Sequence, residues 1–332
     1  MSDTQSNATS SSSVPYLRCI EFFSGIGGYH FALTNSLLKG EILKAFDTNE
    51  IANKVYQNCF GAKPSNRVIN VLTAKELDKF NANCWLMSPP CQPYTRGGKQ
   101  LDLEDNRTQA LKNLINLLPQ LKAKPEFIML ENVVNFETSQ SRDLLIEELK
   151  KLNYNIIEYL VTPIDIGVPN ERPRYFLMAR LLPFTPRLNQ YVDKFVRRIN
   201  TDDVDSNTKT EIKEDTTEES KGCDTALKSI LESESEDLED YLVPEKWILK
   251  SHNFRFDIVN PESYRTSCFT KNTPEEAHWI PRDTKYKLDF PKDVSKLQRY
   301  KLLGNSLNVS LVQKLMEWYW KDEINASGNE EN

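Results

Sequence analysis

The sequence predicts an α/β fold, in which one open sheet of buried strands carries helices on both of its faces. Three observations lead to this prediction. Short apolar runs alternate with helical apolar patterns through residues 17–182. A glycine-rich turn follows the first apolar run, and a cysteine flanked by prolines follows another. Because open α/β sheets bind ligands at the carboxyl ends of their strands, both turns are expected to border one crevice.

Composition limits the kind of protein that this chain can be. Its 332 residues suffice for one large domain with an insertion, or for two domains. No run approaches the ~18 apolar residues of a membrane span, and no apolar segment follows Met1. We therefore expect a soluble intracellular protein of the cytoplasm or nucleus, without a membrane partner. The six cysteines form no CxxC pair, which argues against a disulfide framework and a metal site.

The net charge of −6 is concentrated in one segment. Residues 201–240 hold 15 acidic and 4 basic side chains, a local charge of −11, so the remainder of the chain carries +5. A mildly basic body is compatible with a nucleic-acid partner, although an ordinary solvated surface would carry a similar charge. We expect the acidic segment and the polar residues 1–14 to be disordered.

The first predicted unit is a strand, a glycine turn and a helix. Residues 17–23 form the apolar run, and residues 29–38 carry the helical pattern. Between them, the glycines of Ser24-Gly25-Ile26-Gly27-Gly28 let the backbone approach a ligand, which the free N–H groups of the helix start would face. The turn is neither the GxGxxG dinucleotide fingerprint nor a P-loop. Alone it indicates only a nucleotide-type pocket.

The second unit adds a candidate ribose ligand. A strand predicted at 42–46 ends in Asp47, and a helix is predicted at 50–58. An acidic residue at the end of a second strand is placed to accept both hydroxyls of a ribose. The alternative is that Asp47 caps the helix, a role that Thr48 or Asn49 could fill instead.

A single cysteine is presented on a rigid turn. A predicted buried strand ends at Met87, and Pro89 and Pro90 restrict the backbone before Cys91. Cys91 alone could be an ordinary loop residue, but the neighbouring motifs favour a nucleophile. An ordinary thiol with a pKa near ~8.5 is mostly protonated at neutral pH, so the site must supply the thiolate. The polar segment 95–100 is expected to form a mobile lid, with a surface loop as the alternative.

Charged residues flank two further predicted strands. The strand at 127–130 terminates in Glu131. Partial burial there would raise the pKa of Glu131 and make it a proton donor near neutrality, whereas the alternative is a capping or salt-bridged glutamate. Arg172 and Arg174 alternate across a proline before the strand at 175–179, so both can project to one side and hold a phosphate or a base carbonyl. Otherwise they are solvated surface arginines.

The remaining predicted elements continue the alternation up to residue 182. Residues 68–71 are a third possible edge of the site. The other elements are helices at 73–80, 105–118 and 140–152, a strand at 156–161, and an amphipathic helix at 310–320 that follows a turn at 304–306. Residues 241–269 mix aromatic and basic side chains, as a nucleic-acid-contacting lobe or a small core would.

Five motifs occur along the chain in one order: Phe23-Ser24-Gly25-Ile26-Gly27-Gly28, Pro89-Pro90-Cys91-Gln92, Glu131-Asn132-Val133, Arg172-Pro173-Arg174 and Gly304-Asn305-Ser306. With this set the chain resembles the cytosine-5 methyltransferase family. It looks most like the branch that resembles DNA methyltransferases in sequence but methylates aspartate transfer RNA, because Cys268-Phe269-Thr270 is similar to that branch's signature. The resemblance covers residues 17–182 almost continuously, then about 247–271 and 295–320.

The resemblance implies a Rossmann-like methyltransferase sheet with a small inserted target-recognition lobe, and S-adenosylmethionine as the cofactor, which becomes S-adenosylhomocysteine. It implies that Cys91 attacks C6 of a flipped-out cytosine, that Glu131 holds N3, and that Arg172 and Arg174 hold O2 and a phosphate. The implied cofactor-binding residues are Phe23, Gly25, Ile26, Gly27, Gly28, Asp47, Thr48, Ile69, Asn70, Ser88 and Asn305. The implied substrate-binding residues are Arg96, Lys99, Cys268, Phe269 and Thr270.

The implied reaction is methylation of C5 of an anticodon-loop cytosine, cytosine 38 of aspartate transfer RNA, by a monomer without a metal. One alternative is the same chemistry on DNA. The other is an RNA-binding protein that keeps the pocket but does not turn over, because the lobe is several tens of residues shorter after Lys271 than the family pattern. Asn70 also departs from the acidic residue that the family often places near the adenine. The expected domains are the catalytic domain at 15–184, the lobe at 185–292 and a returning C-terminal segment at 293–325.

Overall fold

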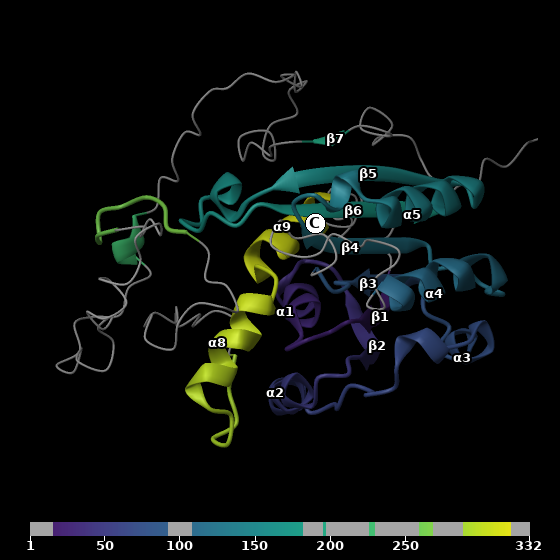
Figure 1. Cartoon of the computed structure of the whole chain (residues 1–332), viewed down its shortest axis with the longest axis horizontal. Coiled ribbons are helices and arrows are strands. Elements are labelled where there is room, and N and C mark those ends of the chain that lie inside the picture. Colours follow the sequence, from purple (N-terminus) through teal and green to yellow (C-terminus); the bar gives the residue numbers. More distant parts are fainter. Residues whose placement is uncertain are drawn as a thin grey trace, which may run out of the picture.

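One mixed sheet forms the centre of the chain (Figure 1). The computed structural model describes residues 16–91, 108–181, 195–196, 226–229, 259–267 and 288–319. Seven strands of these residues follow the order β2-β1-β3-β4-β6-β5-β7. The strands are β1 (Leu17–Phe22), β2 (Gly40–Phe46), β3 (Cys84–Met87), β4 (Phe127–Val133), β5 (Tyr154–Val161), β6 (Arg174–Leu181) and β7 (Phe195–Val196).

The helices confirm the predicted alternation of strands and helices. They are α1 (Gly28–Asn35), α2 (Glu50–Phe60), α3 (Ala74–Asp78), α4 (Gln109–Leu117), α5 (Gln140–Lys151), α8 (Lys296–Asn305) and α9 (Val309–Tyr319). Residues 69–71, the predicted third edge, form a short 3-10 helix. No helix in the described part of the chain is long and apolar enough to cross a membrane.

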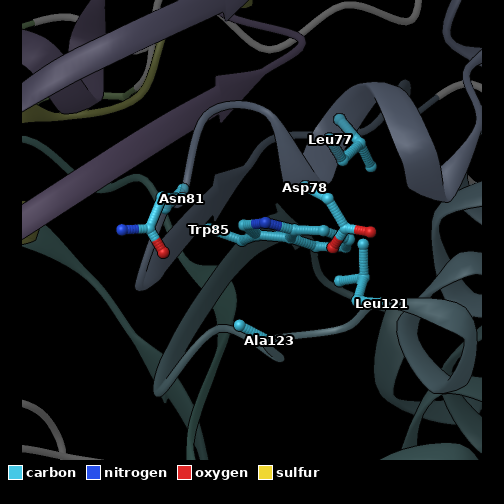
Figure 2. A pocket seen from close by; sticks show the side chains of 7 residues that line it. Leu77, Asp78, Asn81, Trp85, Leu121 and Ala123 are labelled. Atoms are coloured by element: carbon cyan, nitrogen blue, oxygen red, sulfur yellow. The ribbon is translucent and has the colours of Figure 1, made fainter.

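The core has two layers because side chains alternate across the strands. Ile20, Phe22 and Trp85 point to the layer that packs against α4 and α5. Cys19 and Leu86 point to the opposite layer, which packs against α1 and α9. The predicted arrangement, with helices on both faces of one sheet, is therefore confirmed. Beside Trp85 lies a cavity of about 10 Å³, which has room for about one water molecule and is too small for a ligand (Figure 2).

The direction of β6 was not evident from the sequence. β1, β2, β3 and β4 pair in parallel, but β6 is antiparallel to both β4 and β5. Its pairing with β4 continues to the Val133–Arg174 pair, so β4 extends three residues beyond the predicted end at Leu130. Glu131 therefore lies within a paired strand and not after it.

Helix α8 corrects the interpretation of the C-terminal segment. The turn chemistry at 304–306 predicts only a turn there, whereas residues 296–305 form a helix that ends at Asn305, with Ser306 as its C-cap. The apolar pattern of this helix is weak, since only Tyr300 and Leu302 are buried. Its start carries a clear signal in the capping box of Ser295 and Gln298.

Several predicted features lie outside the described residues. These are the tail at 1–14, the lid at 95–100, nearly all of the acidic segment, and most of the residues of the predicted lobe. The described pieces within the lobe boundaries are 226–229, 259–267, 288–292 and β7, which pairs in parallel with β5 at the edge of the sheet. The boundaries of the predicted domains remain predictions.

Candidate active site

One cavity of about 520 Å³ opens at the carboxyl ends of β1, β2, β3 and β4. Because β6 runs antiparallel to β4, the start of β6 lies beside the end of β4. Arg172 and Arg174 consequently reach the same cavity as Glu131 and Cys91. All four residues predicted to be catalytic thus line one cavity, although they come from three separate stretches of the chain.

The glycine turn needs glycine for steric reasons. Gly27 has φ 90°, and a Cβ there would lie 2.4 Å from the ring of Phe60. A Cβ on Gly28 would lie 2.6 Å from the side chain of Leu307, so the start of α1 touches the C-terminal segment. Gly28 lines the cavity, whereas Gly27 does not. Gly27 is required because the rings of Phe60 and Tyr56 occupy the space that a Cβ at this position would need. Phe23 also has a positive φ, 58°, where the turn leaves β1.

The position of Asp47 supports the ribose interpretation over the helix cap. Asn49 caps α2, because its side chain accepts hydrogen bonds from the N–H groups of Ile51 and Ala52, both at 3.1 Å. Asp47 lines the cavity and accepts hydrogen bonds from the N–H groups of Gly25 (2.7 Å) and Asn49 (2.8 Å). Burial raises the pKa of Asp47, and these N–H groups oppose the rise. The hydrogen bond from Gly25 to the carboxylate of Asp47 therefore links the glycine turn to the end of β2.

Two hydrogen bonds hold the turn that carries Cys91. Tyr29 donates from its hydroxyl to the carbonyl of Met87 at 3.3 Å, and Asn132 donates from its amide to the carbonyl of Pro89 at 3.2 Å. Asn132 comes from the neighbouring strand β4 and is buried. The half-buried Cys91 thus stands in the wall of the cavity on a turn that α1 and β4 both hold.

Glu131 and the two arginines form a group of opposite charges with a net positive charge. The Nε of Arg174 lies 3.4 Å from the Oε1 of Glu131, and their side chains are 19% and 12% exposed. Burial raises the pKa of Glu131, while the positive charges of Arg174 and Arg172 oppose the rise. The predicted direction of this shift is confirmed. Glu131 is also salt-bridged, as the alternative held, but its partner is an arginine of the same site.

Arg172 is a buried residue with two partners at the end of α8. Its guanidinium donates to the carbonyl of Gly304 at 3.2 Å and to the carbonyl of Ser306. Carbonyl groups at a helix C-terminus carry partial negative charge, which suits a cation. The interpretation of Arg172 and Arg174 as solvated surface arginines is therefore wrong.

The cavity has polar atoms that fit a ligand with polar groups. Among the described residues, the buried hydroxyl of Ser24 lines the cavity and has no hydrogen-bond partner, whereas the hydroxyl of Ser88, which also lines the cavity, interacts with Glu131 and Tyr29 and lowers their pKa values. Buried hydroxyls normally find a partner, so that of Ser24 fits a polar group of a cofactor such as S-adenosylmethionine. No cluster of three or more metal-ligating side chains occurs in the described part of the chain.

Most of the predicted cofactor residues line this cavity. They are Phe23, Gly25, Ile26, Gly28, Asp47, Thr48, Ile69, Asn70, Ser88 and Asn305. The predicted substrate-binding residues Arg96, Lys99, Cys268, Phe269 and Thr270 lie outside the described residues. Other lining residues were not predicted as ligands, among them Glu21, Ser24, Tyr29, Arg67, Leu302 and Leu307. Glu21 was recognisable as the one carboxylate within an apolar strand.

A described piece of the predicted lobe is attached beside Arg172. The N–H of Glu171 donates to the carbonyl of Thr266 at 2.8 Å, and the N–H of Thr266 donates to the carbonyl of Pro169 at 3.1 Å. Arg265 forms an ion pair with Glu171 at 2.8 Å. A parallel β-bridge between Glu171 and Ser267 thus holds residues 265–267 against the loop that carries Arg172.

Comparisons with known proteins agree with this geometry. The family model of the C-5 cytosine-specific DNA methylases matches residues 17–320. The human tRNA (cytosine(38)-C(5))-methyltransferase is 31% identical, over 91% of this chain and 98% of that protein. A Dictyostelium discoideum protein named DNA (cytosine-5)-methyltransferase is 32% identical, over 91% and 93%. The crystal structure of the S. pombe Dnmt2 methyltransferase matches with a TM-score of 0.72 and 30% identity, over 92% and 99%.

Proposed function

The chain belongs to the family of C-5 cytosine-specific DNA methylases, and from this premise we propose that it methylates C5 of cytosine 38 in transfer RNA, with S-adenosylmethionine as the methyl donor. The relatives named for this reaction match nearly their whole length, including the human protein and one from Schizosaccharomyces pombe, which is 32% identical over 96% of its length. The fold of the chain and the residues around Cys91 are therefore interpreted by likeness to this branch.

One observation carries the proposal. A cysteine, a carboxyl group with a raised pKa and two arginines meet in one cavity, beside a glycine turn and an acidic residue suited to a nucleoside. This set provides a nucleophile for C6, a proton donor for N3 and cations for O2 and a phosphate. The two ends of the cavity thus fit the two reactants of a methyl transfer to cytosine.

The residues would act in a definite order. The thiolate of Cys91 forms a bond to C6 of the cytosine while Glu131 protonates or hydrogen-bonds N3, so that electron density accumulates at C5. Bound S-adenosylmethionine supplies the methyl group that C5 accepts. The proton on C5 then leaves to water, and the electron pair of its bond expels Cys91 as a thiolate. Arg172 and Arg174 hold the base through these steps, and N3 returns its proton to Glu131 as Cys91 is released, which restores the site.

The cofactor would bind along the turn side of the cavity. Backbone groups of residues 25–28 would face it, and Asp47 would accept the ribose hydroxyls. Ile69 and Asn70 would lie near the adenine, and Ser88 and Asn305 would close the methionine end. The side-chain oxygen of Asn70 would accept a hydrogen bond from the adenine amino group, which gives a neutral acceptor in place of a charged carboxylate.

The proposal is tested by methyl transfer from labelled S-adenosylmethionine to unmodified aspartate transfer RNA, with wild-type protein and Cys91→Ala. We expect label in the RNA with the wild type alone, and equal cofactor binding by both proteins. A transfer RNA with cytosine 38 replaced by uridine is the substrate control. Equal labelling by Cys91→Ala would contradict the covalent mechanism, and cofactor binding without any transfer would favour a protein that binds RNA without turnover.

A second candidate substrate is DNA. The Dictyostelium relative, which is as similar as the transfer RNA enzymes, is named for action on DNA. A cytosine in a single-stranded loop requires less unpairing than one in a duplex, and this favours the anticodon loop. Duplex DNA added to the same assay separates the two candidates, because transfer to DNA alone would replace the proposed substrate.

A further inference from the structure

One edge of the cavity is a single turn of 3-10 helix. Residues 69–71 form this turn, in which Ile69 is buried and Asn70 is exposed, and both residues line the cavity. A 3-10 helix has poorer hydrogen-bond geometry than an α-helix and is used in short pieces. Two backbone hydrogen bonds of this turn are 3.3 and 3.2 Å long. The position of the turn therefore depends on contacts with its neighbours.

Asn113 of helix α4 holds both ends of this turn. Its side-chain Nδ2 lies 2.9 Å from the carbonyl oxygen of Ile69, the first residue of the 3-10 helix. The same nitrogen lies 3.1 Å from the carbonyl oxygen of Leu72, which follows the last residue. A carbonyl oxygen can only accept a hydrogen bond, so the amide nitrogen must face the turn and donate one proton to each carbonyl group. The amide thus fits the turn in one orientation only.

Helix α4 is a firm support for this contact. Its buried side chains pack in the core layer that also contains Ile69 and Leu72. Ala110, one turn before Asn113, lines the cavity, whereas Asn113 itself is half-buried and does not. Asn113 therefore joins the packed face of α4 to the turn at the edge of the cavity.

A second contact with the turn is weaker. The Nη2 atom of Arg67 lies 3.4 Å from the carbonyl oxygen of Val71, and the side chain of Arg67, which also pairs with Glu76, is 47% exposed. Long and exposed polar contacts contribute little to stability. The two shorter hydrogen bonds from Asn113 thus provide the stronger support.

We propose that Asn113 is a positioning residue for S-adenosylmethionine, which holds Ile69 and Asn70 where they contact the adenine. The proposal rests on the proposed function, from which it takes the cofactor and the place of its adenine. Asn113 acts on the cofactor through the turn, as a residue that holds a ligand-binding group in place by hydrogen bonds. Because Asn70 would accept a hydrogen bond from the adenine amino group, the position of the turn sets the preference for that group.

Ligand binding to the full chain tests the proposal. The probes are S-adenosylhomocysteine and two competing nucleosides, adenosine and purine riboside, which lacks the amino group. Asn113→Asp keeps the shape of the side chain but turns carboxylate oxygens, in place of the N–H donors, toward two carbonyl oxygens. We expect it to weaken S-adenosylhomocysteine by about tenfold or more. Asn116→Asp places the same charge at an exposed position of α4, so this matched control should leave the affinity unchanged.

The preference for adenosine separates positioning from a general loss of stability. Wild type should bind adenosine more tightly than purine riboside, because only adenosine donates to Asn70. In Asn113→Asp this ratio of affinities should fall by about threefold or more. An unchanged ratio, whether or not S-adenosylhomocysteine binds more weakly, would show that Asn113 only stabilises the fold and would overturn the proposal. If the wild type bound none of the three ligands, the cofactor assignment itself would fail, and this proposal with it.

Asn113→Leu gives a second test if Asn113→Asp does not fold. Leucine removes both hydrogen bonds without placing a negative charge against the carbonyl groups, so the same losses of affinity and of preference should occur, but smaller. With transfer RNA, the KM for S-adenosylmethionine should rise while kcat stays within about twofold of wild type. A fall in kcat at unchanged KM would contradict a role in binding the adenine and would overturn the proposal.

Discussion

The wall of the cavity that β1 and β2 build combines the glycine turn with two carboxylates, Glu21 and Asp47, whereas the wall that β4 and β6 build pairs charges of opposite sign. In the first wall, Gly28 packs directly on Leu307, and the N–H of Gly25 binds Asp47. In the second wall, Glu131 faces Arg174 and Arg172 across the antiparallel pair. The first wall therefore depends on close packing at its glycines and carries carboxylates without a paired arginine in the described part of the chain, and the second, the charged wall, depends on the pairing of Glu131 with arginines.

This difference follows from the direction of the strands. Parallel strands end at the same edge of the sheet and continue into loops, so they offer turns and helix N-termini to a ligand. An antiparallel strand brings its beginning to that edge, and the residues before and at its start can face the end of its neighbour. We expect substitutions in the two walls to affect binding and turnover differently, and the following predictions test this.

The largest effect is expected for Glu131→Gln. The variant keeps the shape of the side chain but cannot transfer a proton to N3, so turnover should fall by about 10²–10⁴-fold. The affinity for S-adenosylmethionine should stay within twofold, because the change lies in the charged wall. Single-turnover kinetics and calorimetry measure the two quantities. A loss of cofactor affinity with normal turnover would show that Glu131 contributes to cofactor binding and not to proton transfer, and would contradict the assignment of the two walls to different functions.

The next effect is expected for Gly28→Ala. The new methyl group would lie 2.6 Å from the Leu307 side chain, which must move, and Leu307 lines the cavity. Overpacking costs about 1–3 kcal/mol, and we expect cofactor affinity to fall by about tenfold. Adding Leu307→Ala makes room for the methyl group and should restore much of the affinity. If the double variant binds more weakly than Gly28→Ala, the contact is not the cause.

A smaller effect is expected on the pH profile of Arg174→Gln. Arg174 lowers the pKa of Glu131, so its removal raises that pKa further above its ordinary value. Glu131 acts as a proton donor, and its activity is lost as pH rises through its pKa. The alkaline limb of the normalised turnover profile should therefore move to higher pH, although the variant is less active overall. A shift to lower pH would contradict the assignment of Glu131 as the acid.

The smallest effect is expected for Arg265→Ala, which removes the ion pair with Glu171. Both side chains are well exposed, at 60% and 42%, and exposed ion pairs contribute about 0–1 kcal/mol. The backbone hydrogen bonds between Glu171 and Thr266 remain, so melting temperature and turnover should change little. A large loss of turnover at unchanged stability would mean that this pair positions Arg172, and would extend the charged wall into the lobe.

Local chemistry along the chain predicted the strands and helices up to residue 181 and much of the site. The prolines before Cys91, the glycines after β1 and the periodic apolar residues act over a few neighbours, so their effects are visible in the sequence. Asp47 at the end of β2 was predicted for the same reason. The weakly amphipathic helix α8 was not, because packing against the rest of the molecule, and not its own pattern, stabilises it.

The tertiary structure alone decided how these pieces meet. The sequence determined that Cys91 would stand at a strand end, but only the antiparallel insertion of β6 next to β4 brought Arg172 and Arg174 to Glu131. Strand order depends on pairing between distant segments, which no local pattern encodes. In the same way Glu21 was visible as an acidic residue in an apolar strand, but its unpartnered oxygen in the cavity became evident only from the fold.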